Sequence, residues 1–314
     1  MNTEVNFAGI KMKNPVTVAS GTFGYGREYS QFFDLSELGG IITKGTSLKP
    51  RDGNKPSRVY ETPSGMLNSI GLQNPGVEYF LEYDLPWLKK QNTAIIVNAC
   101  GSTIEDYVEV CRILNKSDID GVELNLSCPN VKAGCLAFGT TYEGVKEVTS
   151  KVRKVLDKPL IVKLTPNVTD ITLPAKAAQD AGADAVSLIN TLLGMSININ
   201  TRKPHLANNT GGLSGPAVKP VAVRMVYQVA QAIDIPILGM GGIVNGDDAV
   251  EFMLAGASAI SIGAGNFIDP YTSVNTVKGI EEYKKKHNIE KIEDIVGKVQ
   301  MNWKQRIKNL QNIM

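Results

Sequence analysis

The residues most capable of chemistry in this 314-residue chain are a cysteine, two lysines and several asparagines, each close to a short apolar run. Cys128 lies in Asn-Leu-Ser-Cys-Pro-Asn (125–130). Cysteine is more often a buried apolar side chain, but the polar neighbours and Pro129 argue against a packed core here. A thiol with a pKa of about 8.5 is a poor base in water, yet one aligned against an acidic C–H group can remove its proton. Cys128 is therefore the candidate catalytic base.

Two lysines offer positive charge at similar positions. Lys163 ends an apolar run in Val-Lys-Leu-Thr-Pro (162–166) and could stabilise negative charge on a reduced flavin ring. The alternative for Lys163 is a structural ion pair with a neighbouring carboxylate. Lys44 begins Lys-Gly-Thr (44–46) and could hold a substrate carboxylate, the alternative being an ordinary surface lysine.

Asparagines supply neutral hydrogen-bonding groups at the same positions. The amide of asparagine carries both a donor and an acceptor, which matches the alternating N–H and C=O groups along the edge of a pyrimidine ring. Asn68, Asn125 and Asn190 are the candidates. Asparagine also caps turns, so the three together indicate such a pocket better than any one alone.

Two glycine-rich segments are typical of a phosphate site. They are Gly-Met-Gly-Gly-Ile (239–243) and Ile-Gly-Ala-Gly-Asn (262–266), and each follows an apolar run. Glycine lets backbone N–H groups approach a phosphate closely, and the loops after the last two strands of a (β/α)₈ barrel often bind one. The alternative is that these glycines only serve tight turns.

The elements that must position these residues alternate along the chain. Short apolar runs, typical of parallel strands buried on both faces, are separated by helical patterns. One helical pattern is Ile104, Tyr107, Val108 and Cys111, and Val250, Met253, Leu254 and Ala257 repeat it. The expected strands are Val16–Ala19, Gly40–Thr43, Ala94–Asn98, Gly121–Leu126, Leu160–Leu164, Ala185–Ile189, Ile237–Met240 and Ala259–Ile262.

Eight strands alternating with helices favour a single α/β domain over residues 1–314, a (β/α)₈ TIM barrel. The segment Val5–Pro15 is expected to form a hairpin that closes the bottom of the barrel. Two long stretches, from Lys44 to about Leu85 and from Asn190 to about Gly215, follow strands and should lie over the C-terminal face. Long loops there are usually lids or binding walls.

The composition excludes several classes of function. Lysine and arginine number 33 against 31 aspartates and glutamates, so the charge balance indicates neither nucleic acid nor a charged membrane surface as a partner. Neither a signal peptide nor a long apolar segment is visible. The four cysteines are typical of reduced cytoplasmic thiols, their spacing does not match an iron–sulfur motif, and the two histidines make a metal site improbable. A cytoplasmic enzyme is expected.

Five motifs resemble class 1 dihydroorotate dehydrogenases over most of the barrel. Within that class, Val-Lys-x-Gly after Ser-Cys-Pro-Asn resembles the 1B subclass, whose catalytic subunit is NAD-linked and works with a partner subunit carrying FAD and a [2Fe–2S] cluster. The membrane-bound class 2 enzymes use a serine base and an N-terminal extension, so they are disfavoured. The motifs are Asn-Leu-Ser-Cys-Pro-Asn-Val-Lys-Ala-Gly (125–134), Lys-Gly-Thr-Ser-Leu-Lys-Pro-Arg-Asp-Gly-Asn (44–54), Asn-Ser-Ile-Gly-Leu-Gln-Asn-Pro-Gly (68–76), Ile-Asn-Thr-Leu-Leu-Gly-Met (189–195) and Thr-Gly-Gly-Leu-Ser-Gly-Pro-Ala (210–217).

The resemblance implies a role for each matching residue, with one FMN per chain and no metal. Cys128 would remove the C5 proton of dihydroorotate while a hydride leaves C6 for flavin N5. The implied substrate-binding residues are Lys44, Asn68, Ser69, Ile70, Gly71, Leu72, Asn125, Asn190 and Thr191. The implied FMN-binding residues are Ser20, Lys44, Gly45, Asn98, Asn125, Lys163, Ile189, Gly215, Gly241, Gly242, Gly263 and Ala264.

The chain departs from the family pattern at two positions. Cys135 stands where relatives usually have a second glycine, and Ala264 stands where they commonly have threonine. The resemblance also implies a homodimer of catalytic subunits inside a heterotetramer. Three alternatives remain open: a fumarate-dependent class 1A enzyme, a flavin-free barrel enzyme that binds a phosphorylated ligand, and a non-catalytic subunit of a pyrimidine-pathway assembly.

Overall fold

Eight short parallel strands close into a barrel in the computed structural model, which describes residues 3–127 and 138–301. The strands follow one another around the barrel in the order β10-β15-β16-β3-β4-β7-β8-β9. The predicted (β/α)₈ barrel is thus confirmed. The strands are β3 (Val16–Val18), β4 (Gly40–Ile42), β7 (Ala94–Ala99), β8 (Gly121–Asn125), β9 (Leu160–Lys163), β10 (Ala185–Leu188), β15 (Ile237–Met240) and β16 (Ala259–Ile262).

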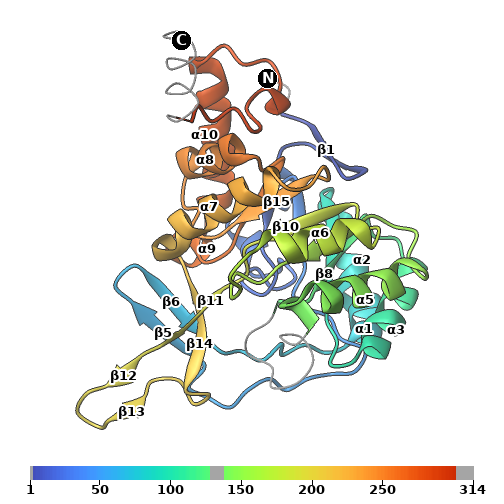
Figure 1. The fold of residues 1–314 in the computed structure, drawn as a ribbon, viewed down its shortest axis with the longest axis vertical. Coiled ribbons are helices and arrows are strands. Elements are labelled where there is room, and N and C mark those ends of the chain that lie inside the picture. The colour runs from blue at the N-terminus through green and yellow to red at the C-terminus, as the bar shows by residue number, and fades with distance from the viewer. Residues whose placement is uncertain (1–2, 128–137, 302–314) are drawn as a thin grey trace, which may run out of the picture.

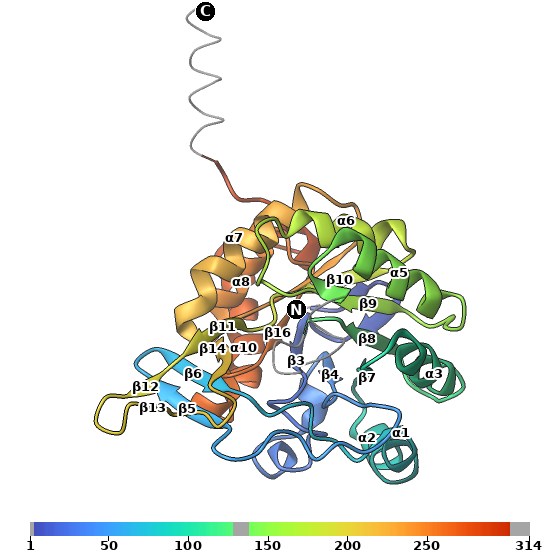
Figure 2. The same cartoon turned by 60° about the horizontal axis from the view of Figure 1, so that its bottom comes forward.

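The barrel strands are buried along their whole length, which explains why they read as continuous apolar runs. Helices surround them and cover the outer face (Figure 2). Among the described residues, none of these helices combines the length and apolar character needed to cross a bilayer. The helices are α1 (Val77–Tyr79), α2 (Leu85–Leu88), α3 (Ile104–Asn115), α5 (Tyr142–Arg153), α6 (Thr172–Asp180), α7 (Lys219–Ala230), α8 (Gly246–Ala255), α9 (Gly265–Ile268) and α10 (Thr272–Lys286).

Helix α3 shows how local sequence fixes these covering elements. Thr103 and Asp106 form a reciprocal capping box that satisfies backbone donors at its first turn. The helix buries Tyr107 and Cys111, as its predicted apolar face requires. The Tyr107 hydroxyl donates a hydrogen bond of 2.8 Å to the carbonyl of Asn125 at the end of β8. A core side chain of α3 therefore fixes the strand end from which the predicted site begins.

The predicted hairpin is confirmed at the other end of the barrel. Strands β1 (Val5–Phe7) and β2 (Ile10–Met12) pair antiparallel. Ile10 is buried, and a Cβ built on Gly121 would lie 2.7 Å from Ile10 Cδ1. Because Gly121 begins β8, the hairpin closes the barrel at the amino ends of its strands.

The two long stretches after β4 and β10 join in one antiparallel sheet, which the sequence analysis did not predict. Its order is β11-β14-β6-β5, and a second pair, β12 with β13, extends as an arm away from the barrel (Figure 1). The register pairs Gly212 with both Leu193 and Asn68. The strands are β5 (Val59–Thr62), β6 (Gly65–Asn68), β11 (Leu192–Met195), β12 (Ile197–Asn198), β13 (Lys203–Pro204) and β14 (Thr210–Ser214).

Candidate active site

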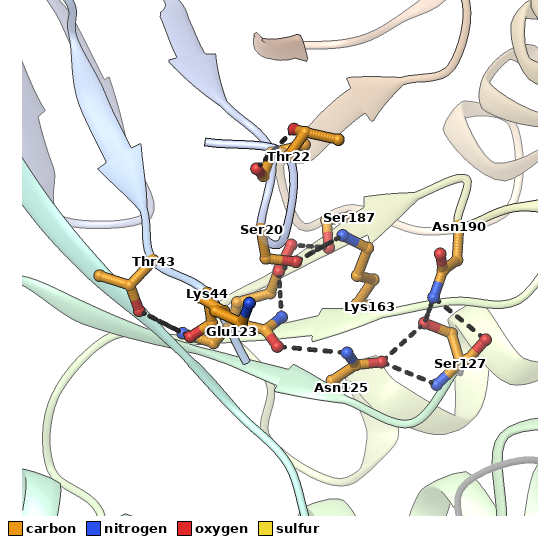
Figure 3. Close-up of polar contacts among 12 residues, drawn as sticks. Ser20, Thr22, Thr43, Lys44, Glu123, Asn125, Ser127, Lys163, Ser187 and Asn190 are labelled. Carbon is orange, nitrogen blue, oxygen red and sulfur yellow. Dashed lines mark hydrogen bonds and ion pairs between the residues drawn. The ribbon is translucent and has the colours of Figure 1, made fainter. Parts of the chain in front are cut away.

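A buried carboxylate and a buried ammonium lie together at the carboxyl ends of the barrel strands (Figure 3). Lys163 Nζ, at the end of β9, is 3.6 Å from Glu123 Oε2 on β8, and the two side chains are only 4% and 0% exposed. Ser20 Oγ, just after β3, is 3.3 Å from the same ammonium, and Ser187 Oγ on β10 donates to Glu123 Oε1 at 2.7 Å. Lys163 thus forms the ion pair with a neighbouring carboxylate that was the alternative to a cofactor-binding role. It also lies beside Ser20, another predicted cofactor-binding residue.

A chain of amide hydrogen bonds extends from this ion pair. Asn98 Nδ2 donates to Glu123 Oε2 at 2.5 Å, and Asn125 Nδ2 donates to Asn98 Oδ1 at 3.2 Å. The backbone and hydroxyl of Ser127 donate to Asn125 Oδ1, and Asn190 Nδ2 donates to Ser127 Oγ at 2.8 Å (Figure 3). Every amide is oriented by its neighbours. The structure therefore brings the predicted residues Asn98, Asn125 and Asn190 into one ordered network.

Residues 128–137 are outside the described part of the chain. The predicted base Cys128 and the departure at Cys135 both fall in this segment, so their roles remain predictions. The last described residue before the segment is Ser127, which is fully buried and held by Asn125 and Asn190.

Lys44 lies at the end of β4 and is half-buried. Its carbonyl accepts from the hydroxyls of Thr43 and Thr46, and Thr43 Oγ1 in turn accepts from the backbone N–H of Asn98 at 3.4 Å. Burial lowers the pKa of Lys44, nearby Arg58 lowers it further, and Glu28 opposes the shift. The role of Lys44 as a holder of a substrate carboxylate stays a prediction, with an ordinary surface lysine as its alternative.

The lowered pKa of Lys44 gives a testable pH dependence. A bound anion favours the charged ammonium, so an anionic substrate binds best below that pKa. We expect KM to be flat at lower pH and to rise by about tenfold per pH unit once the pH exceeds the lowered pKa. Steady-state kinetics across pH would measure this. In Lys44→Arg the side chain stays charged, so its KM should stay flat over the same range; a parallel rise in both proteins would assign the effect to another group.

Residues 69–72 form a loop beside these strand ends, and hydrogen bonds fix its backbone. The backbone N–H of Asn54 donates to the carbonyl of Ile70, and its side-chain amide donates to the carbonyl of Ser69. Gly71 and Leu72 both take left-handed backbone conformations, with φ of +77° and +56°. Among the described residues, the buried hydroxyl of Ser69 has no hydrogen-bond partner. A buried polar atom in that state fits a residue that contacts a ligand.

Glycine at position 45 lets this loop approach the amide network. A Cβ built there would lie 3.2 Å from Asn98 Oδ1 and 3.3 Å from Leu72 Cδ2. Leu72, in the segment predicted to bind the substrate, therefore packs against Gly45, which is predicted to bind the cofactor.

The antiparallel sheet adds the remaining predicted substrate-binding residues. Asn68 Nδ2 donates to the carbonyl of Gly212 at 3.4 Å, and a Cβ on Gly212 would overlap Thr191 Oγ1. Asn68 and Thr191 thus approach the same glycine from the two long stretches after β4 and β10, which are called the two insertions below. Asn167, which was not predicted, fixes Thr191 by donating to its carbonyl at 3.0 Å.

Glycines after β14 and β15 form a tight backbone cradle. Gly215, Gly241 and Gly242 have φ of +96°, +123° and +82°, conformations that side chains rarely adopt. A Cβ on Gly242 would lie 2.8 Å from the carbonyl oxygen of Gly215, and one on Gly241 would lie 3.1 Å from Ile189 Cγ1. Gly242 is therefore packed against Gly215, and Gly241 against Ile189, all four being predicted cofactor-binding residues. Gly241 and Gly242 are partly exposed, so their backbone could be reached by a phosphate-bearing cofactor, and these residues fit one.

The other predicted phosphate loop follows β16. A Cβ on Gly263 would meet no atom closer than Ala19 Cβ at 3.6 Å, so this backbone is open. Ala264 is the N-cap of α9 and makes no side-chain capping bond. Alanine offers no hydroxyl there, but the N–H groups that begin α9 remain as donors.

Glu123, Asn167 and Ser187 are site residues that sequence reasoning missed. Glu123 had a visible signal, because it is the one charged residue in the apolar run 121–126. A buried charge in a strand requires a partner. Asn167 and Ser187 carried no comparable signal, because small polar residues are common near strand ends.

Comparisons with known proteins found similar sequences over nearly the whole chain. The family model described as dihydroorotate dehydrogenase matches residues 2–283. The chain is 58% identical over 297 residues to "Dihydroorotate dehydrogenase B (NAD(+)), catalytic subunit" of Alkaliphilus metalliredigens, which covers 95% of this chain and 98% of the relative. Relatives with the same name in Bacteroides thetaiotaomicron and Thermoanaerobacter sp. are 55% and 53% identical, over 95% and 96% of this chain and 98% and 100% of their own lengths.

Proposed function

The chain belongs to the dihydroorotate dehydrogenase family, and from this premise we propose that it is the catalytic subunit of the NAD-linked type B enzyme. Its reaction is the oxidation of (S)-dihydroorotate to orotate in pyrimidine biosynthesis, with FMN as the bound cofactor. The observation that carries this proposal is the single network joining Ser20, Asn98, Asn125, Lys163 and Asn190 at the ends of neighbouring strands.

The residues present fit FMN in two parts. The backbone around Gly241–Gly242 and Gly263–Ala264 would hold its phosphate, and Lys163 with Ser20 would lie at the ring. FMN, when bound, supplies a two-electron acceptor for hydride. The hydride would come from C6 of dihydroorotate, and the ammonium of Lys163 would stabilise negative charge at the flavin ring. The remaining proposed FMN contacts are Lys44, Gly45, Asn98, Asn125, Ile189 and Gly215.

The substrate would be held by charge and amide contacts. Lys44 holds its carboxylate, while Asn68, Asn125 and Asn190 present donors and acceptors to the ring, together with Thr191 and the segment 69–72. Cys128 removes the proton from C5. Proton removal at C5 and hydride loss at C6 leave the C5–C6 double bond of orotate.

We also propose a final electron acceptor and an oligomeric assembly for this chain. The word "subunit" in the relatives' names supports a separate partner, which we propose carries FAD and a [2Fe–2S] cluster and reduces NAD. We also propose a homodimer of catalytic subunits within a heterotetramer. Exposed apolar side chains on the sheet and its arm, at Leu193, Met195, Ile197 and Ile199, support self-association. A cytoplasmic location and one domain over residues 1–314 stay predictions.

A spectroscopic experiment tests the function. The purified chain should be yellow, and dihydroorotate should bleach the flavin under anaerobic conditions. NAD reduction should require the partner subunit, and fumarate should not serve the lone chain as acceptor. Colourless protein that binds no added FMN would favour the flavin-free barrel enzyme, bound flavin that dihydroorotate does not reduce would favour the non-catalytic subunit, and rapid fumarate reduction would assign the chain to class 1A.

A further inference from the structure

Lys219, the first residue of α7, forms ion pairs with two carboxylates of α8. Its Nζ lies 2.6 Å from Asp248 Oδ1 and 2.8 Å from Glu251 Oε2. The two helices lie side by side on the outside of the barrel (Figure 1). Asp248 is only 7% exposed, so the ammonium compensates a carboxylate that is largely removed from water. These three residues are called the charge triad below.

The charge triad is bonded to the loop that follows β15. Asp248 Oδ2 accepts a hydrogen bond of 2.9 Å from the backbone N–H of Val244, and the backbone N–H of Asp248 donates to Asn245 Oδ1 at 2.9 Å. Val244 comes two residues after Gly242, one of the glycines proposed to hold the cofactor phosphate. The carboxylate that Lys219 compensates therefore fixes the far end of the proposed phosphate loop.

The backbone of Lys219 packs against the same loop. A Cβ built on Gly242 would lie 2.8 Å from Lys219 Cβ and 3.0 Å from Lys219 N. The preceding residue, Val218, donates its N–H to the carbonyl of Gly215 at 3.1 Å. Lys219 thus contacts the glycine cradle through its backbone and the end of the loop through its ammonium.

The charges of the triad matter to a phosphate bound at this loop. A phosphate monoester carries about 1.5 to 2 negative charges near neutral pH, and like charges repel one another over several ångströms. Hydrogen bonds to Asp248 and then to Glu251 raise the pKa of Lys219, so its ammonium stays charged at neutral pH. Without that ammonium, both carboxylates would repel the phosphate; with it, only one negative charge is left uncompensated.

We propose that Lys219 is a positioning residue for the phosphate of the cofactor, an inference that rests on the proposed function. Its backbone supports Gly242, and its ammonium cancels carboxylate charge behind the loop 241–244. This role concerns the phosphate end of the cofactor alone, whereas Lys163 is proposed to act at the ring.

The test compares FMN with riboflavin, which has the same ring and no phosphate. Flavin fluorescence on dilution of the loaded full chain gives both dissociation constants, and urea denaturation shows that each variant folds. The variants are Lys219→Met, the conservative Lys219→Arg, the half-exposed Glu251→Gln, and the double variant Lys219→Met/Glu251→Gln. The matched control is Lys151→Met on α5, which removes a lysine paired with Glu147 at 2.7 Å.

We expect the dissociation constant of FMN to rise about tenfold in Lys219→Met, while that of riboflavin stays at the wild-type value. Lys219→Arg and Lys151→Met should match the wild type for both flavins. Glu251→Gln should bind FMN more tightly than the wild type, and the double variant should regain part of the FMN affinity that Lys219→Met loses, because each has one carboxylate fewer beside the loop.

Two results would overturn the proposal. One is an equal loss of FMN and riboflavin affinity in Lys219→Met, which would indicate a role in packing alone. The other is FMN affinity that does not respond to Glu251→Gln, in the single and the double variant alike; this result does not require Lys219→Met to fold. Wild-type chain that binds no FMN would instead refute the proposed function, so the two failures are distinguishable.

Discussion

Replacement of Cys128 by alanine is expected to slow the reduction of bound FMN by dihydroorotate by about 10²–10⁴-fold, the usual contribution of a general acid or base. FMN should remain bound, because its proposed contacts lie elsewhere. Anaerobic stopped-flow absorbance would give both the flavin content and the rate. The expectation depends on the sequence motif 125–130 and on the buried position of Ser127 just before the cysteine.

Cys111 offers a matched control on the same chain. It is fully buried on α3, and burial raises its pKa to about 12, so its thiol stays protonated and cannot act as a base. Cys111→Ala should therefore reduce FMN at the wild-type rate. A Cys128→Ala enzyme that is equally fast would exclude Cys128 as the base, while slow reduction in both variants would indicate general damage to the fold.

Replacement of Lys163 by methionine is expected to lower both the free energy of unfolding and the affinity for FMN. The substitution leaves Glu123, which is 0% exposed, without its positive partner. Removing one member of a buried ion pair costs about 3–5 kcal/mol, because the other charge stays buried and uncompensated. Urea denaturation at a fixed FMN concentration would measure the stability, and flavin fluorescence on dilution would measure the affinity.

A double variant separates the structural role of Lys163 from its role at the cofactor. Lys163→Met/Glu123→Gln removes both charges; the Gln oxygen can still accept from Asn98 Nδ2, and the Ser187 hydroxyl, which now donates to the other oxygen, can turn to accept from the Gln amide N–H. We expect most of the lost stability to return. The reduction potential of the bound flavin should nevertheless be lower than in the wild type, in this double variant as in Lys163→Met, because neither has an ammonium to stabilise the reduced ring. A double variant whose flavin has the wild-type reduction potential would show that Lys163 serves only as the structural partner of Glu123.

The barrel was predictable because its strands are buried on both faces. That environment selects continuous β-branched and aliphatic residues, as in Ile95–Val97, and the boundaries of all eight strands agree with the structure to within one residue. The hairpin was predictable from its position before the first barrel strand.

The antiparallel sheet was not predictable for a physical reason. Its strands come from two segments, around residues 59–68 and 192–214, and local sequence patterns do not indicate which distant segments pair. Gly194, Gly211 and Gly212 also interrupt the alternation that identifies strands. Glycine is needed there because added side chains would overlap the neighbouring strands and Thr191.

Much of the candidate site followed from one rule, that residues just past parallel strands converge. The rule located Ser20, Asn98, Asn125 and Asn190, which the structure links. It did not locate Glu123, because that side chain lies within β8 and not after it. Cys128 and the departure at Cys135 remain predictions.

The shared sheet of the two insertions has an evolutionary consequence. Asn68 and Thr191 meet at Gly212, so the segments that carry them form one inheritable module although more than a hundred residues separate them. A chimera that takes one insertion from a distant relative would combine mismatched halves. Changes of ligand preference in such enzymes should therefore arise through coordinated exchange of both insertions, with the barrel beneath them left intact.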